Sequence, residues 1–135
     1  MTTGPAIDVN ALERIPDNVT LRDFVPQHDV FPHVDAVMCH GGSGTVIGAL
    51  AGGLPLVVTP IGADQPENAR AVDALGAGIA VFKPDAVAMS AALRKVLIDP
   101  RWREVAGKVS GEIAAQPGIE TAVDEMLPHA RHSDQ

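Results

Sequence analysis

The chain has 135 residues, of which 46% are hydrophobic and 3% aromatic, and its formal net charge is −7. This length suits one domain with an aliphatic core and is too short for two. The negative charge and the scattered basic residues argue against a nucleic acid, whose phosphates are bound by basic surfaces, and against a membrane surface. The single cysteine, Cys39, excludes an intrachain disulfide and gives no metal motif. Its apolar flanks predict a small buried side chain.

Residues 36–63 contain no Asp, Glu, Lys or Arg, which is long enough to consider a membrane span. The same stretch holds seven glycines and two prolines and breaks into short pieces with different periods. We therefore reject a span. The first residues, MTTGPAIDVN, lack the basic and apolar regions of a signal peptide, and we expect a cytoplasmic protein.

The first predicted element is a half-buried strand over 19–25, VTLRDFV, because apolar and polar side chains alternate there. Pro26 ends it, and residues 27–34 are expected to form a loop or a helical turn. The apolar run at 35–40, DAVMCH, predicts a buried strand.

A short helix is expected next, beginning at Ser43 or Thr45 and ending at Gly52–Gly53. The proline-bounded run 54–60 predicts another buried strand. A helix should follow from about Pro66 to Leu75, since proline suits a first turn, and GIAVF at 78–82 predicts a fourth strand.

The rest of the chain, from residue 85 to 129, has helical periodicity with breaks near Asp99–Pro100 and Gln116–Gly118. Trp102 is expected to anchor packing there. Alternating strands and helices predict an α/β fold, a Rossmann-like parallel sheet with flanking helices and a helical C-terminal segment. Ligands bind at the carboxyl ends of such strands, which carry the polar residues of 26–27, 40–45 and 60–65.

The stretch CHGGSGTVIGALAGG, residues 39–53, matches neither common phosphate motif. Gly42 and Gly44 fit a dinucleotide fingerprint, but Ile47 stands at its third glycine, and no Lys-Ser or Lys-Thr completes a Walker A loop. A more general reading is a glycine turn whose amides, helix dipole and hydroxyls bind phosphate, with His40 as a further donor. The alternative is that Ser43 or Thr45 only caps the helix and that His40 is an ordinary strand-end residue.

Four segments in order, VPQ, HGGSGT, GLPLVVTP and DQPENA, resemble the nucleotide-sugar-binding motif of GT-B, family-1 type glycosyltransferases. The looser resemblance covers nearly the whole chain, and its pattern is closest to bacterial enzymes that glycosylate antibiotics and other natural products. It implies that residues 1–135 are a single domain, the donor-binding half, without the N-terminal acceptor domain. That domain supplies the catalytic base in the family, so no catalytic residue is expected in this chain.

The resemblance also implies roles for individual positions. Pro26 and Gln27 would lie against the nucleotide base, and His40 would contact the diphosphate. Further phosphate contacts would come from Gly42, Ser43, Gly44 and Thr45. Asp64 and Gln65 would hold hydroxyls of the sugar. Asp64 and Gln65 can also form a helix-capping turn, which is compatible with sugar binding.

This chain departs from plant members of the family at three positions. Gly48 stands where they carry the glutamate for the ribose, Val25 where they carry tryptophan, and Gly44 where they carry asparagine. The choice between uridine and thymidine nucleotides therefore stays open.

The resemblance further implies that the first strand of the domain is missing, while TTGPAIDV resembles the end of the second. We expect residues 19–25 either to pair beside 35–40 or to complete a sheet with a second copy of the chain, since an open edge invites pairing.

The predicted function is the UDP- or TDP-sugar-binding part of an inverting glycosyltransferase that acts on a hydroxyl of a natural product. No cofactor or metal is expected, only the nucleotide-diphosphate sugar as substrate. Alone, the chain should bind this donor weakly and turn over nothing. The alternative is an inactive truncated or accessory domain that acts through oligomerisation or a protein partner.

Overall fold

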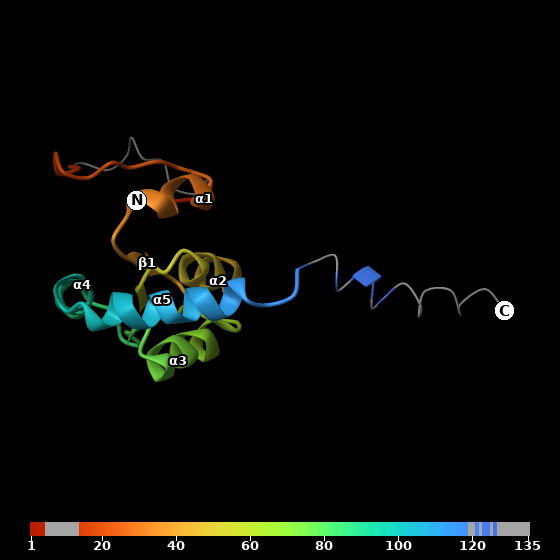
Figure 1. The fold of residues 1–135 in the computed structure, drawn as a ribbon. Helices are drawn as coiled ribbons and strands as arrows, with labels where there is room; N and C mark the ends of the chain where they lie inside the picture. The colour runs from red at the N-terminus through yellow and green to blue at the C-terminus, as the bar shows by residue number, and fades with distance from the viewer. Residues whose placement is uncertain (5–13, 119–120, 122, 125, 127–135) are drawn as a thin grey trace.

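The computed structural model describes residues 1–4, 14–118, 121, 123–124 and 126 (Figure 1). Its ordered elements alternate between short strands and helices, as the sequence predicts for an α/β fold. In chain order they are α1 (Gln27–Val30), the 3-10 helix η2 (Phe31–His33), β1 (Val37–Cys39), α2 (Ser43–Ala51), β2 (Leu56–Val58), α3 (Gln65–Leu75), β3 (Gly78–Ala80), α4 (Ala86–Ile98) and α5 (Arg101–Ala114).

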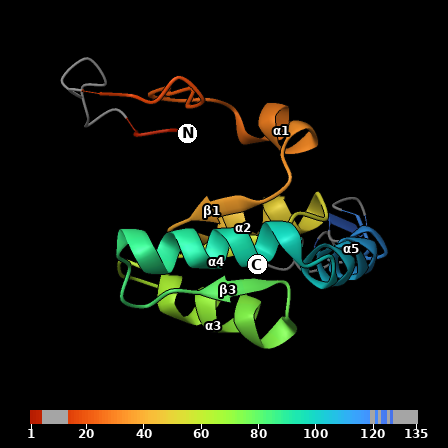
Figure 2. The same ribbon diagram turned by 90° about the vertical axis from the view of Figure 1, so that its left-hand side faces the viewer.

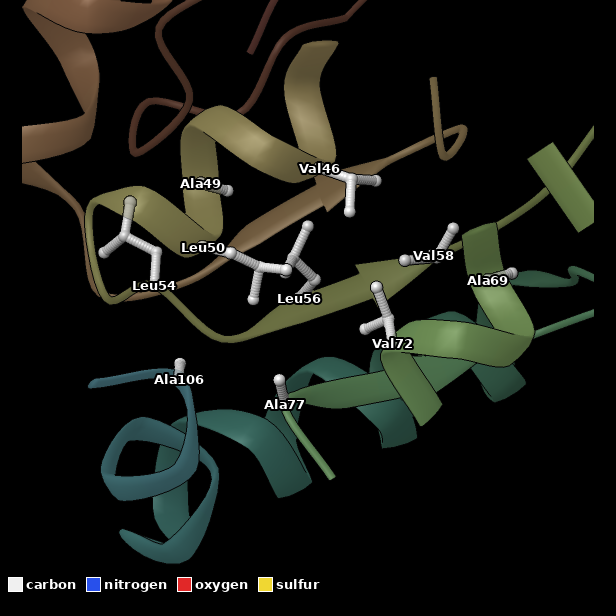
Figure 3. Close-up of a cluster of buried hydrophobic side chains, with 10 residues drawn as sticks. All are labelled: Val46, Ala49, Leu50, Leu54, Leu56, Val58, Ala69, Val72, Ala77 and Ala106. Carbon is white, nitrogen blue, oxygen red and sulfur yellow. The ribbon is translucent and has the colours of Figure 1, made fainter. Parts of the chain in front are cut away.

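The three strands form one parallel sheet in the order β1-β2-β3. β2 lies in the centre, and its three residues are fully buried because helices cover both faces of the sheet. Leu56 and Val58 belong to a core cluster with α2, α3 and α5, whereas Val57 belongs to a second cluster with α4 and Trp102. Figure 3 shows the first cluster and Figure 2 shows α4 lying across the sheet. This two-sided burial explains why the strand has an unbroken apolar sequence.

The helix boundaries follow local signals that the sequence makes visible. α2 begins at Ser43 and is followed by Gly52, and α3 has Pro66 in its first turn and ends before Gly76. α4 begins after Asp85, whose carboxylate accepts a hydrogen bond from the Ala88 amide at 2.7 Å. The predicted helices in this part of the chain are therefore confirmed.

The C-terminal helical region is confirmed as far as Ala114, where α5 ends shortly before the predicted break near Gln116–Gly118, and the predicted break between α4 and α5 is also present. Trp102 lies at the start of α5, is 8% exposed, and packs in the second core cluster. The Arg101 guanidinium lies 4.7 Å from the centre of its ring. The predicted packing anchor is confirmed, while most of the helix predicted after residue 118 lies outside the described residues. No described helix has the length and apolar character needed to span a membrane.

The predicted strand over 19–25 is wrong. Arg22 forms only an isolated parallel bridge with Thr2, supported by Thr3 and Gly4 amides that donate to the carbonyls of Arg22 and Asp23. This N-terminal segment lies apart from the sheet (Figures 1 and 2), and Phe24 is 75% exposed. Val19, Leu21 and Val25 are half-buried, but among the described residues the backbone of the segment has a single bridge and no regular ladder of hydrogen bonds, which a strand requires.

The expected pairing of 19–25 beside 35–40 is also wrong, because residues 1–4 pair with 19–25 instead. β1 is an edge strand of the described sheet, with β2 as its only partner strand. Completion of the sheet by a second copy stays a prediction.

Candidate functional site

The turn after β1 is packed tightly against its neighbours. Gly41 is buried and has a φ of 92°, a conformation that favours glycine. A Cβ at this position would lie 2.7 Å from Val58 Cγ1 and 3.2 Å from the backbone oxygen of Gln65. The turn therefore rests on both β2 and the start of α3.

His40 is exposed at the carboxyl end of β1, and its ring lies against the turn that follows. A Cβ on Gly42 would lie only 2.7 Å from His40 Nε2. The imidazole thus occupies the space that a side chain at position 42 would take, next to the backbone that leads into α2. This arrangement places an imidazole nitrogen beside the first amides of that helix.

The N-terminus of α2 has no side-chain cap, because the capping position is Gly42. Ser43 is exposed, and neither its hydroxyl nor that of Thr45 bonds to the helix backbone. The reading in which these hydroxyls only cap the helix is therefore wrong. Free amides, the exposed hydroxyl of Ser43 and the positive end of a helix dipole together form a surface suited to an anion.

α1 brings the predicted base-binding residues to the same place. Pro26 directly precedes this helix, and Gln27 is its first residue. The Gln27 side-chain amide donates a hydrogen bond of 2.8 Å to the Thr45 hydroxyl. Two segments of the predicted site that are 18 positions apart in the sequence are thus directly joined.

The loop between β2 and α3 is held by Gln65. Its Oε1 accepts hydrogen bonds from the amides of Ile61 at 2.8 Å and Gly62 at 3.0 Å. The side-chain oxygen of Gln65 is therefore used inside the loop, while its NH₂ group has no hydrogen-bond partner in the described part of the chain and can donate elsewhere. Ala63, in the same loop, has a φ of 55°, an uncommon value for a residue other than glycine.

Asp64 is exposed and stands at the capping position of α3, as the capping reading predicts, but its carboxylate does not bond to the helix backbone. Instead, Asp64 Oδ2 accepts a hydrogen bond of 2.9 Å from Asn68 Nδ2. The same Asn68 nitrogen donates to the Gly41 carbonyl, also at 2.9 Å. Sequence reasoning did not single out Asn68, although its position four residues after Asp64 places both on one side of a helix.

Gly48 makes room for an aromatic side chain. A Cβ on Gly48 would lie 3.0 Å from Phe31 Cε2. At the position where the resembling plant enzymes carry glutamate, this chain packs the ring of Phe31 against the bare backbone of α2.

Cys39 is half-buried and packs against the first core cluster. Burial raises the pKa of its thiol, and a hydrogen bond with the backbone of Gly41 partly opposes this shift. The thiol therefore stays protonated at neutral pH, as expected of a packing residue rather than a nucleophile. Within the described ranges, no group of three or more His, Cys, Asp or Glu side chains could hold a metal ion.

Comparisons with known proteins agree with this architecture. The sequence profile of "Erythromycin biosynthesis protein CIII-like, C-terminal domain" matches residues 2–127. The elloramycin glycosyltransferase ElmGT of Streptomyces olivaceus is 41% identical over 110 residues, which cover 82% of this chain and 28% of that protein.

Solved structures give the same result. The kitacinnamycin glycotransferase has a TM-score of 0.84 at 31% identity, over 93% of this chain and 33% of its own. Glycosyltransferase VinC, solved in complex with dTDP, has a TM-score of 0.85 at 27% identity, over 90% of this chain and 31% of its own. The chain thus spans about a third of the length of these proteins. It belongs to the erythromycin biosynthesis protein CIII-like C-terminal domain family and has the fold of the C-terminal domain of GT-B glycosyltransferases.

Proposed function

We propose that this chain is the donor-binding part of an inverting glycosyltransferase and binds a UDP- or TDP-sugar at the carboxyl edge of its sheet. The observation that carries the proposal is that hydrogen bonds join the separate motif segments into one site. Gln27 bonds to Thr45, and Asn68 links Gly41 to Asp64. The dTDP bound to the similar VinC structure supports a nucleoside diphosphate as ligand.

In this proposal the diphosphate lies at the N-terminus of α2. The amides at its start, the hydroxyls of Ser43 and Thr45 and the imidazole of His40 would donate to phosphate oxygens. As the bond between sugar and diphosphate breaks, negative charge grows on the leaving group. Donors already oriented toward that position stabilise the charge without reorganising, which is where such interactions lower a barrier most. No metal or other cofactor is part of this proposal.

The sugar would lie near the loop that carries Asp64 and Gln65. The Asp64 carboxylate accepts hydrogen bonds from hydroxyls, and the free NH₂ group of Gln65 donates to them. The acceptor molecule, and the base that deprotonates its hydroxyl, would be held by a region of the kind that makes up the other two thirds of the similar enzymes. By itself, the chain should therefore bind donor without transferring sugar.

Titration calorimetry of the purified chain with UDP-glucose and TDP-glucose tests the proposal. We expect measurable binding at millimolar ligand, and we expect His40→Ala to weaken it about tenfold, since a hydrogen bond to a charged group is lost. His33→Ala is the matched control, because this exposed histidine lies in η2, before β1 rather than after it. Folded protein that binds neither nucleotide sugar would refute the proposal.

A further inference from the structure

The side chain of Asn68 connects two parts of the proposed site. They are the turn at 40–45, called the phosphate turn, and the loop at 61–65, called the sugar loop. It is half-buried, and its Nδ2 lies 2.9 Å from the Gly41 carbonyl oxygen and 2.9 Å from Asp64 Oδ2. Both partners are acceptors only, so the nitrogen and not the oxygen of the amide must face them. Since an NH₂ group carries two hydrogens, Asn68 makes both bonds at once.

The first bond fixes the orientation of a peptide unit in the phosphate turn. In a planar trans peptide, the carbonyl of one residue and the amide hydrogen of the next point in opposite directions. Holding the Gly41 carbonyl toward α3 therefore directs the Gly42 amide away from α3. Gly41 and Gly42 have no side chains that could fix this orientation, so Asn68 supplies the constraint from another element.

The second bond restrains the Asp64 carboxylate. The backbone of the sugar loop is already held, because Gln65 Oε1 bonds to the amides of Ile61 and Gly62. None of these bonds acts on the side chain of Asp64, which is exposed. The hydrogen bond from Asn68 engages one carboxylate oxygen of Asp64 and thereby fixes the direction in which the other oxygen points.

We propose that Asn68 is a positioning residue that couples recognition of the sugar to recognition of the diphosphate. This inference rests on the proposed function. It makes a specific claim: losing Asn68 should cost more affinity for a nucleotide sugar than for the nucleoside diphosphate alone. A residue that only stabilised the fold would change both affinities by the same factor.

The test compares Asn68→Ala, Asn68→Asp and the control Glu67→Gln in the complete chain. Glu67 is the neighbouring exposed residue of α3, and its side chain has no hydrogen-bond or ion-pair partner among the described residues. Calorimetry with UDP, UDP-glucose, TDP and TDP-glucose gives the ratio of sugar-nucleotide to diphosphate affinity for each variant. Thermal unfolding of each variant records any change in overall stability.

Asn68→Ala is expected to lower that ratio about tenfold, because the Asp64 carboxylate is no longer held in position to accept hydrogen bonds from the sugar. Asn68→Asp keeps the size of the side chain but removes the donor, and it sets a new carboxylate against Asp64 Oδ2 and the Gly41 carbonyl. It should lower the ratio at least as far as Asn68→Ala, while Glu67→Gln should leave it unchanged. An equal loss for all four ligands, or a wild-type ratio in Asn68→Asp, would overturn the inference and leave the proposed function standing.

Failure of the proposed function has a different outcome, namely wild-type protein that binds none of the four ligands. Amide hydrogen exchange without ligand then still decides whether Asn68 holds both segments. Faster exchange in both 40–45 and 61–65 of Asn68→Ala supports the link. A change confined to one of these segments contradicts it.

Discussion

β2 and the segment 19–25 are both rich in residues that favour strands, but their surroundings differ. β2 has a strand on each side and a core cluster on each face, and Leu56 is 0% exposed. Segment 19–25 has a single bridge to Thr2, and its Phe24 is 75% exposed. An apolar pattern therefore specifies which face of a strand can be buried, whereas the strand itself forms only where neighbouring strands pair with its backbone.

The strongest test of this difference is a large-to-small substitution in each region. Leu56→Ala should lower the free energy of unfolding by about 2–5 kcal/mol, because it leaves a cavity in the first core cluster. Phe24→Ala should change it by less than about 0.5 kcal/mol, since that side chain is already in water. Urea denaturation measures both values. A comparable loss in both variants would show that 19–25 is packed in solution.

A second test uses two glycines with positive φ. A Cβ on Gly41, φ 92°, would meet Val58 and Gln65, whereas a Cβ on Gly4, φ 76°, would have no atom of the described residues within 4 Å. Gly41→Ala should therefore cost about 2–4 kcal/mol from strain and overlap, and Gly4→Ala much less. Thermal unfolding of the two variants gives the comparison. Equal effects would mean that backbone strain alone, and not packing, decides the cost.

The third and smallest test compares two aspartates that accept backbone hydrogen bonds of similar length. Asp85 accepts from the Ala88 amide at 2.7 Å and caps α4, while Asp23 accepts from the Phe24 amide at 2.8 Å in the N-terminal segment. Asp85→Ala should cost about 1 kcal/mol, the usual value for a lost helix cap, and Asp23→Ala almost nothing. Denaturant midpoints distinguish the two. A loss for Asp23→Ala as large as for Asp85→Ala would contradict the proposed difference between the regions.

Much of the fold could be predicted because its signals are local. Pro66 and Gly76 mark the ends of α3 whatever surrounds them, and the apolar run through Leu56 requires burial on both faces. The error at 19–25 has the opposite cause, since its alternation is equally clear but a strand also requires pairing along its backbone, and among the described residues this segment has a single bridge to Thr2.

The candidate site likewise has residues whose placement local sequence signals predict and others whose role depends on distant parts of the chain. The placement of His40, Ser43 and Asp64 at one edge follows from strand ends that the sequence reveals. The role of Asn68 could not be predicted from its own surroundings, because its partner Gly41 lies 27 positions earlier and meets it only in the folded chain. The use of Gln65 Oε1 inside its own loop likewise depends on the conformation around Ala63.

The position of β1 at the edge of the described sheet has a practical consequence for work with the isolated chain. Backbone groups along an edge strand can pair with another molecule, and like charge on two copies of the chain opposes such pairing. Its formal charge of −7 at pH 7 supplies that repulsion, and the charge falls to zero near the isoelectric point of about 5.0. Purification and ligand titrations are therefore best kept well above that pH and at low salt, because salt screens the repulsion between copies of the chain.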